Sequence, residues 1–171
     1  MENFRVEKKF VLGKMKDIYL IKRLLNLGFY KQYPNREISS IYLDTLNYDY
    51  VRENINGVSE RKKIRFRWYD DKFEKIFLEE KNKNNFTVSK VVNKISLISN
   101  KKNILNDLAK FLLSNKTKII KNQNCKMVLK TNYKRSYWIS SDKKIRATID
   151  IDINASNLSN PISKLKLSDT I

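Results

Sequence analysis

The chain has 171 residues, which is enough for one domain with a sizeable core, and its 41% content of hydrophobic residues excludes a disordered tail protein. Its 36 Lys and Arg residues against 18 Asp and Glu residues leave a formal net charge of +18, a self-repulsion that a nucleic acid, a polyphosphate, a nucleotide or an anionic membrane surface would relieve. The chain has no histidine, which excludes Ser-His-Asp and Cys-His catalysis.

The hydrophobic pattern predicts strands in pairs that are interrupted by helices. In chain order, it predicts a strand over residues 3–12, a helix from Met15 to Gly28, a strand over 36–43, a short helix over 48–56, strands over 60–69 and 74–83, a helix over 101–113, and strands over 126–139 and 144–153. The mostly polar residues 154–171 predict no element. This order predicts an α+β antiparallel sheet or barrel with flanking helices, in a single domain over residues 1–171.

Cationic and apolar side chains alternate along the predicted strands, and side chains two apart in a strand share a face. One face of residues 61–69 carries Arg61, Lys63, Arg65 and Arg67, and the other carries Ile64, Phe66 and Trp68. Similar faces are expected for Phe77, Glu79, Lys81 and Lys83, and for Lys144, Arg146, Thr148, Asp150 and Asp152. If helices cover the apolar faces, the cations either meet bulk water or line a curled, positively charged tunnel suited to phosphate chains.

Glutamates lie beside cations in the predicted strands over residues 3–12 and 74–83. Glu7 and Glu79 are candidate metal ligands, because an acid inside a basic phosphate site commonly holds Mg²⁺ or Mn²⁺. The alternative is ion pairing within each strand, of Glu7 with Lys9 and of Glu79 with Lys81.

Several motifs occur in the order found in a known family. They are Arg5-x-Glu7-x-Lys9-Phe10, SSIYLDT at 39–45, RKKIRFRWY at 61–69, LEEK at 78–81, YKR at 133–135 and RATID at 146–150. From residue 3 to residue 153 the chain resembles the VTC domain, the polyphosphate polymerase domain of the vacuolar transporter chaperone complex. That domain belongs to the CYTH-like superfamily of triphosphate tunnel metalloenzymes.

The resemblance implies a closed antiparallel tunnel that binds triphosphate, and transfer of the ATP γ-phosphate to a growing polyphosphate chain with Mn²⁺ or Mg²⁺. It implies catalytic roles for Arg65, Arg67, Lys81, Arg135 and Arg146. Lys9, Lys90 and Tyr133 are implied to contact phosphate, and Lys63, on the same face as Arg65, is expected to join them. Phosphoryl transfer needs mainly positioning and charge neutralisation, which such a cage supplies. Lys90 has a second interpretation, because residues 87–89 are also compatible with the start of a helix.

Two positions depart from the family pattern. Arg5 stands where simple triphosphatases of the superfamily have the first acid of E-x-E-x-K, which favours the polymerase over the hydrolase. Residues 164–167, KLKL, contain no acid where the family has a metal-binding glutamate, so the domain is expected to be C-terminally short and its last strand or strands are in question. This departure predicts either an open tunnel or an incomplete metal site. A non-catalytic module that holds polyphosphate or triphosphate, and a triphosphate hydrolase, are therefore the alternatives to the polymerase.

ATP and polyphosphate are the expected partners, and a membrane-protein partner would leave no trace in the sequence. Nucleic acid is not expected, because Phe66 and Trp68 lie opposite Arg65 and Arg67, so bases and phosphates would need opposite faces of one strand. The first residues lack the apolar core of a signal peptide, and the single Cys125 makes no intramolecular disulfide. We therefore expect a cytoplasmic protein.

Overall fold

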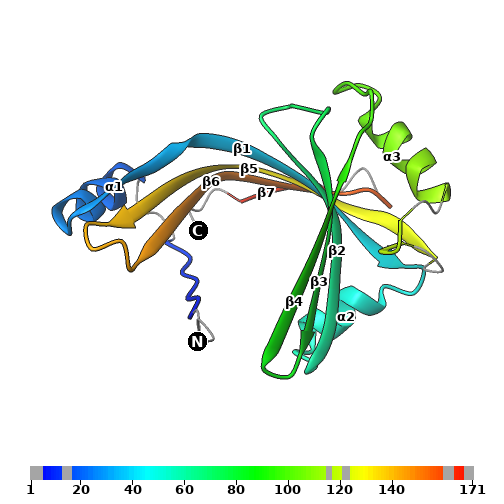
Figure 1. Ribbon diagram of the computed structural model, residues 1–171, viewed down its shortest axis with the longest axis horizontal. Coiled ribbons are helices and arrows are strands. Elements are labelled where there is room, and N and C mark those ends of the chain that lie inside the picture. Colours follow the sequence, from blue (N-terminus) through cyan, green and yellow to red (C-terminus); the bar gives the residue numbers. More distant parts are fainter. Residues whose placement is uncertain (1–5, 13–16, 115–116, 121–123, 160–163, 168–171) are drawn as a thin grey trace. The chain divides into compact units, whose positions relative to one another are not determined.

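The structure is a computed structural model that describes residues 6–12, 17–114, 117–120, 124–159 and 164–167. Its elements in chain order are α1 (Asp17–Asn26), β1 (Phe29–Thr45), α2 (Asp49–Ile55), β2 (Glu60–Tyr69), β3 (Ile76–Asn84), β4 (Thr87–Ile95), α3 (Ile104–Leu113), β5 (Cys125–Ser140), β6 (Arg146–Asn157) and β7 (Lys164–Leu167) (Figure 1). The strands form one sheet in the order β4-β3-β2-β1-β5-β6-β7, and β1, β2, β3 and β4 pair antiparallel. The predicted α+β antiparallel fold is confirmed.

The sheet ends at two edge strands, β4 and β7. The resemblance implies strands that close into a ring, but the described strands leave the sheet open. Each edge strand has one strand neighbour in this order, whereas each strand of a closed barrel has two. The predicted antiparallel sheet is therefore present without the implied closure.

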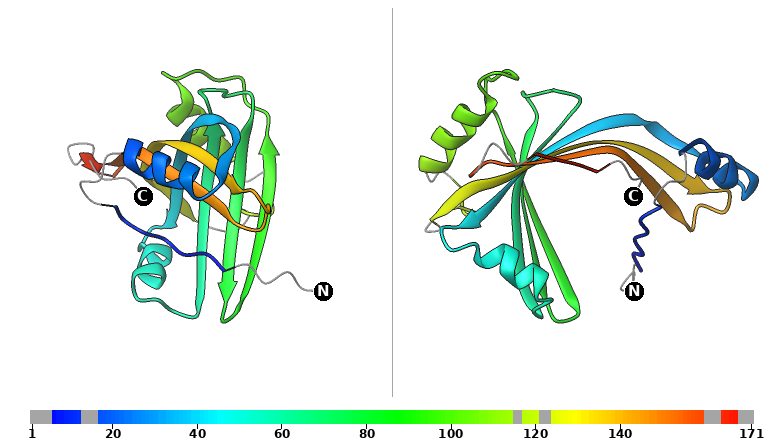
Figure 2. Two further views of the ribbon diagram at one scale, coloured as in Figure 1. Left: turned by 90° about the vertical axis from the view of Figure 1, so that its left-hand side faces the viewer. Right: turned by 180° about the vertical axis from the view of Figure 1, so that it is seen from behind.

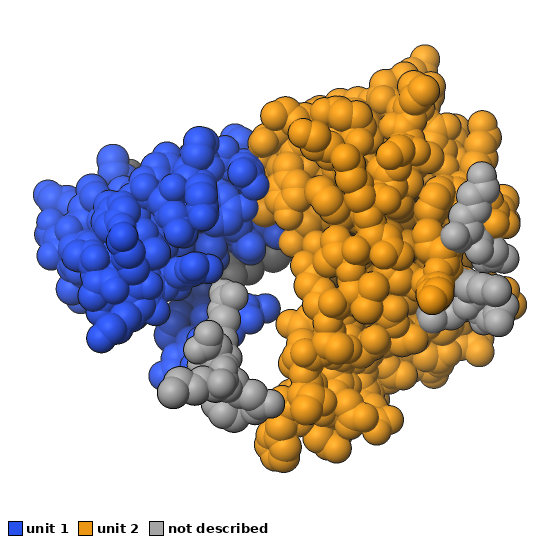
Figure 3. Space-filling model, viewed as in Figure 1, with its two compact units in different colours: residues 1–36, 133–154, 166–171 blue, residues 37–132, 155–165 orange. Residues whose placement is uncertain are grey.

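Two compact units are described separately here (Figure 3). Unit 1 comprises residues 1–36, 133–154 and 166–171, and unit 2 comprises residues 37–132 and 155–165. Unit 1 contains α1, and unit 2 contains α2, α3, β2, β3 and β4. The single domain over residues 1–171 stays a prediction.

The core of unit 2 lies on one face of β1, β2 and β3. Its buried strand residues are Ile41, Leu43, Ile64, Phe66, Trp68, Ile76 and Leu78. Ile104 and Leu108, four residues apart on α3, are buried against this face, and the Phe111 ring meets the Phe66 ring edge to face at 6.1 Å between centroids. Both α2 and α3 lie on the same side of β2, β3 and β4 in two views (Figure 1, Figure 2). The helices of unit 2 thus cover the apolar face and leave the other face to polar side chains.

In unit 1, α1 ends at Asn26, and Gly28 in the turn that follows stops the helix, as the sequence predicts. Gly28 has a φ of +77°, a conformation that side chains with a Cβ rarely adopt. Its carbonyl accepts a 2.7 Å hydrogen bond from the Ser141 hydroxyl, and a Cβ at Gly28 would lie 2.7 Å from that oxygen. Both the backbone turn and this close approach therefore require glycine.

Two predictions about strands are wrong. Residues 6–12 lie outside any strand, and residues 3–5, Arg5 among them, are outside the described residues. Val6 and Phe10 are 82% and 65% exposed, so these two apolar side chains of the segment are not packed in a core. Conversely, β4 is a strand where the sequence predicted no element or the start of a helix. Ile95 is the only buried side chain of this edge strand, so the alternation that would identify it is missing.

Candidate functional site

Cationic side chains gather on the face of β2, β3 and β4 that lies opposite the core of unit 2. The strand register places Arg61 opposite Lys83, Lys63 opposite Lys81, and Arg65 opposite Glu79. It also places Lys90 opposite Lys81, and Lys94 opposite Phe77, which itself faces Arg67. We call this set the cationic face: Arg61, Lys63, Arg65, Arg67, Lys81, Lys83, Lys90 and Lys94. Directly opposed like charges destabilise a sheet, so this face favours an anion.

Glu79 lies at the centre of this face and is 5% exposed. Its Oε2 accepts hydrogen bonds from Arg65 Nε at 2.8 Å and lies 2.7 Å from Arg65 Nη2. Its Oε1 accepts a hydrogen bond from Lys90 Nζ at 2.9 Å, and Arg67 Nη1 lies 3.9 Å from Oε2. The alternative interpretation of Glu79, ion pairing within the sheet, is confirmed, but the partners are Arg65 and Lys90 in place of Lys81. Arg65 directly faces Glu79, and facing positions on paired strands have Cβ atoms about 5 Å apart, closer than residues i and i+2 of one strand. Lys90 faces Lys81 and reaches Glu79 diagonally.

These contacts change the protonation behaviour of Glu79 and Arg65. Burial alone would raise the pKa of the Glu79 carboxyl, but the hydrogen bonds from Lys90 and Arg65 and the charge of Arg67 outweigh burial and lower it. Burial alone would lower the pKa of Arg65, but the nearby Tyr42 and Glu79 raise it overall. Both groups are therefore held in their charged forms.

Two residues of β1 support this face and escaped the sequence analysis. Tyr42 lies opposite Arg65 in the register, and its hydroxyl accepts a 3.2 Å hydrogen bond from Arg65 Nη1. Ser40 lies opposite Arg67, and its hydroxyl accepts a 3.2 Å hydrogen bond from Arg67 Nε. Alternation along β1 predicts that Ser40 and Tyr42 share a face, but only the register identifies the arginines that they contact.

Unit 1 holds the remaining candidate cations. Arg135 of β5 forms a bidentate pair with Asp150 of β6, with both N···O distances at 2.6 Å, and its guanidinium lies 5.2 Å from the centroid of the Tyr133 ring. Burial alone would lower the pKa of Arg135, but the hydrogen bonds from Arg135 to Asp150 and the neighbouring tyrosines raise it. Arg146 is exposed at the first residue of β6. Arg135 is therefore already neutralised by an acid, whereas Arg146 faces solvent.

The predicted common face of residues 144–152 is interrupted within unit 1. Lys144 precedes β6, which begins at Arg146. Asp150 pairs with Arg135 while Asp152 pairs with the adjacent Lys134, 3.0 Å away, although neighbours on a strand point to opposite faces. Asp152 has a φ of +56°, and such a residue breaks strand alternation as a β-bulge does. The expectation that Asp150 and Asp152 share a face is therefore wrong.

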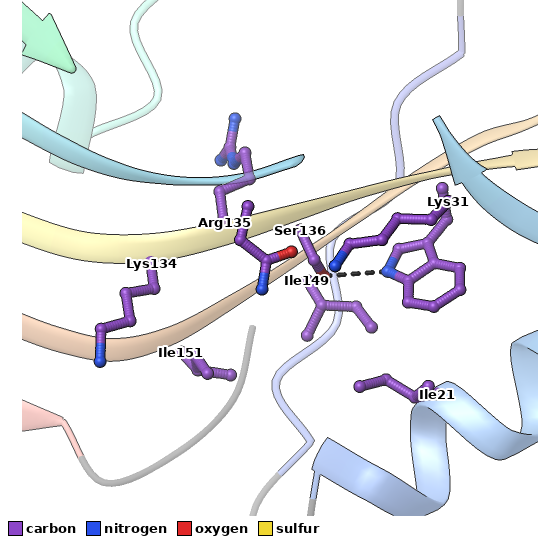
Figure 4. A pocket seen from close by; sticks show the side chains of 9 residues that line it. Ile21, Lys31, Lys134, Arg135, Ser136, Ile149 and Ile151 are labelled. Carbon is purple, nitrogen blue, oxygen red and sulfur yellow. Dashed lines mark hydrogen bonds between the residues drawn. The ribbon is translucent and has the colours of Figure 1, made fainter. Parts of the chain in front are cut away.

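A shallow pocket lies inside unit 1 (Figure 4). It contains about 390 Å³ of space that is partly open to solvent. Its lining residues are Ile21, Lys31, Asn35, Lys134, Arg135, Ser136, Trp138, Ile149 and Ile151. Trp138 Nε1 donates a 2.9 Å hydrogen bond to the Ser136 hydroxyl, and the Lys134 and Arg135 side chains leave β5 in opposite directions (Figure 4). The pocket therefore does not gather these two cations around one point.

Glu7 and Lys9 lie in unit 1, outside any strand. Both side chains are exposed, and Lys9 Nζ lies 3.9 Å from Glu7 Oε1. This contact agrees with the ion-pair interpretation of these two residues. No group of three His, Cys, Asp or Glu side chains that could hold a metal ion occurs in the described part of the chain.

The aromatic residues that could stack nucleic-acid bases are mostly in the cores. Phe66, Trp68 and Trp138 are buried, and Tyr69 packs edge to face on Phe77 with ring centroids 6.3 Å apart. They therefore offer no open stacking platform. Among the described helices, none has the length and apolar character needed to cross a membrane.

Comparison with known proteins completes this description. No curated protein matches the chain. A solved structure from Vibrio parahaemolyticus, provisionally described as an adenylate cyclase, aligns with a TM-score of 0.49 and 12% identity over 80% of this chain and 63% of that one, so this chain spans less than two thirds of its length. The PH1819 protein of Pyrococcus horikoshii OT3 aligns with a TM-score of 0.46 and 14% identity over 81% of this chain and 67% of that one. The profile of the VTC domain matches residues 4–168, almost the whole chain, and the protein therefore belongs to the VTC domain family.

Proposed function

We propose that this protein binds linear triphosphate and polyphosphate on the cationic face of unit 2. The observation that carries the proposal is the convergence of Arg and Lys side chains from three neighbouring strands around the single carboxylate of Glu79. Of the side chains that β2, β3 and β4 place on this face, Glu79 is the only acid. Cations therefore outnumber carboxylates on the strands of this face, so a polyanion would lower their mutual repulsion.

The chemistry of the cations favours phosphate. Arginine presents a planar fork of N–H donors that matches two phosphate oxygens, and lysine supplies a compact point charge. Arg65 and Arg67 lie two residues apart on β2, while Lys63, Lys81 and Lys90 lie directly opposite one another across β2, β3 and β4. A chain of linked phosphates would meet several of these side chains at once, whereas a single phosphate would meet few.

The activity we propose is transfer of the ATP γ-phosphate to a growing polyphosphate chain, and membership of the VTC family supports it. Such a transfer depends on aligning donor and acceptor and on neutralising the charge of the transferred group. In unit 2, Arg65, Arg67 and Lys81 would neutralise that charge, and Lys63 and Lys90 would hold the neighbouring phosphates. The roles of Lys9, Tyr133, Arg135 and Arg146, a cytoplasmic location and a membrane-protein partner stay predictions.

The residues of the cationic face do not by themselves suit a divalent metal ion. Mg²⁺ and Mn²⁺ prefer several oxygen ligands, but this face offers one carboxylate, and both of its oxygens already accept hydrogen bonds from cations. Mg²⁺ or Mn²⁺ therefore enters the proposal only as an ion carried by the phosphate oxygens of the substrate, and we derive no step through it.

Two alternatives in the same substrate class remain. A non-catalytic module would hold polyphosphate or triphosphate without turnover, and a hydrolase would release orthophosphate. The open sheet favours the binding module, because the strand order ends at β4 without the barrel closure that would exclude water from phosphoryl transfer.

The proposal is tested by incubating the purified chain with ATP and Mn²⁺ and analysing the products, alongside calorimetric titration with inorganic triphosphate. A nuclease-resistant phosphate polymer identifies a polymerase, orthophosphate identifies a hydrolase, and triphosphate binding without either product identifies a binding module. No binding and no product would contradict the proposal.

A pair of lysine variants locates the site. Lys81→Ala removes an exposed cation that makes no ion pair among the described residues, and we expect it to weaken triphosphate binding by about tenfold, the size of one charge-assisted contact. Lys110→Ala removes the same charge from α3, on the other side of the strands, and should leave the affinity nearly unchanged. Equal effects of the two variants would mean that triphosphate responds only to the net charge.

A further inference from the structure

Glu79 connects cations from the two strands that flank its own. Arg65 comes from β2 and Lys90 from β4, and each donates a hydrogen bond to a different oxygen of the Glu79 carboxylate. Arg65 is also held by Tyr42 of β1, which accepts a hydrogen bond from Nη1. The side chain of Arg65 is thereby fixed through Nε, Nη2 and Nη1, so its guanidinium has little freedom to turn.

This arrangement does not suit a metal ligand. A carboxylate that binds a cation such as Mn²⁺ needs a free oxygen and further oxygen ligands beside it. Both oxygens of Glu79 already accept hydrogen bonds from cationic side chains, and β2, β3 and β4 supply no second acid on this face. A metal ion at Glu79 would also displace or approach three cationic groups, those of Arg65, Arg67 and Lys90.

We infer that Glu79 is a positioning residue for the anion site and not a metal ligand. It holds Arg65 and Lys90 in fixed positions on the cationic face, so that this face binds a phosphate chain without a metal ion held by the protein. The inference rests on the proposed function, because it assumes that the cationic face takes up linear phosphates.

The positioning role has a physical advantage. Lysine and arginine side chains each have several rotatable bonds, and ordering them when a ligand binds lowers the affinity. Glu79 orders Arg65 and Lys90 before the ligand arrives, and the remaining N–H donors of the Arg65 guanidinium stay available for phosphate oxygens. This ordering also has a disadvantage, because the negative charge of Glu79 repels an incoming anion.

These two effects of Glu79 have opposite signs, which makes the inference testable. If Glu79 acts only as a charge, Glu79→Gln raises the net charge of the face by one and tightens triphosphate binding. If Glu79 positions Arg65 and Lys90, the same variant weakens binding, because the amide loses the charged hydrogen bonds and turns an N–H group toward one of the cations. We expect binding to weaken by about tenfold, as for one lost charge-assisted hydrogen bond.

The experiment is calorimetric titration of the full chain with inorganic triphosphate in EDTA, for the wild type, Glu79→Gln and Glu80→Gln. Glu80 is the adjacent residue on β3, its side chain lies on the opposite face, and it pairs with Lys62 at 3.3 Å. Glu80→Gln therefore removes the same charge from the same strand without touching Arg65 or Lys90. Weaker binding for Glu79→Gln, with Glu80→Gln close to the wild type, is the expected result.

Other outcomes separate the inference from the proposed function. Equal or tighter binding by Glu79→Gln would overturn the inference while leaving triphosphate binding intact. No binding by the wild type, with or without Mg²⁺, would overturn the proposed function itself. A separate titration with Mn²⁺ and no phosphate should show no binding, and Mn²⁺ binding that is lost in Glu79→Gln would establish the metal-ligand role instead.

A second pair of variants applies if Glu79→Gln fails to fold. Lys90→Gln and Lys94→Gln remove one charge each from exposed positions on the same face of β4, but only Lys90 contacts Glu79. We expect Lys90→Gln to weaken triphosphate binding severalfold more than Lys94→Gln. Equal losses would show that position on the face does not matter, and would overturn the inference.

Discussion

The Glu79 carboxyl keeps its negative charge in a buried place because cations surround it. Burial favours the neutral acid, yet the hydrogen bonds from Lys90 and Arg65 lower the pKa of Glu79 below its usual value. A carboxyl with a lower pKa in the folded than in the unfolded chain stabilises the fold at pH values above its unfolded pKa. That stabilisation is lost as the pH falls through the folded-state pKa.

We therefore predict that acid weakens the wild-type fold partly through Glu79. As the pH falls from 6 to values below about 4, where a glutamate is already protonated in the unfolded chain, the wild type should lose more stability than Glu79→Gln, since glutamine does not titrate. Urea midpoints measured across this range check the prediction. The control Glu74→Gln, which removes an exposed carboxyl from the turn before β3, should follow the wild type. Parallel curves for wild type and Glu79→Gln would contradict the account.

Residue spacing predicts which side chains share a face but not which side chains touch. Alternation correctly placed Arg65 and Arg67 opposite Phe66, because that choice depends only on the period of a strand. The partners of Glu79 depend on how three strands are aligned, and a register is set by packing and turns far from the residue itself. For this reason the contacts of Arg65 with Tyr42 and Glu79 could not be predicted from spacing.

Asp44, near the end of β1, organises the start of α2. Asp44 is buried, its Oδ1 accepts hydrogen bonds from the amides of Thr45 and Tyr50, and its Oδ2 accepts one from the amide of Val51. The first amides of a helix have no partner within the helix, so a carboxylate there stabilises it. Asp44 thereby fixes a helix of only seven residues against β2.

We predict that Asp44→Ala lowers the free energy of unfolding by about 3 kcal/mol, because it leaves several amides without their charged acceptor. Asp44→Asn keeps one carbonyl oxygen as an acceptor and should lose less. Urea denaturation of the two variants and the wild type measures both changes. The control Glu74→Ala removes an exposed acid from the turn before β3. If Asp44→Ala lowers the free energy of unfolding by no more than this control does, the capping role is contradicted.

Elements with one buried face were predictable, and elements without one were not. β2 occurs over the predicted residues 60–69, because Ile64, Phe66 and Trp68 are buried at every second position. β4 was missed because an edge strand with exposed valines and lysines has no such period. Residues 6–12 show the reverse error, since they alternate without lying in a strand. Alternation of apolar side chains indicates a half-buried strand only where another element packs against those side chains.

The properties of the whole molecule follow from an excess of positive charge spread over two compact units. The net charge of +18 was sufficient to predict an anionic partner class, because composition alone determines it. An open sheet was one of the two outcomes expected from the acid-free residues 164–167, but the sequence could not decide between them, since closure depends on pairing between strands at the two ends of the strand order. Membership of the VTC family does not determine whether the sheet closes either. The proposed function therefore rests on the geometry of the cationic face of unit 2.

The most direct test is an NMR titration of the isotope-labelled chain with inorganic triphosphate, followed through the backbone amide signals. The account predicts saturable shift changes concentrated in β2, β3 and β4, strongest near Arg65, Glu79, Lys81 and Lys90, with little change in α3 on the opposite side of these strands. Saturable changes confined to residues outside these three strands, or none at millimolar triphosphate, would contradict the claim that the cationic face is the phosphate site.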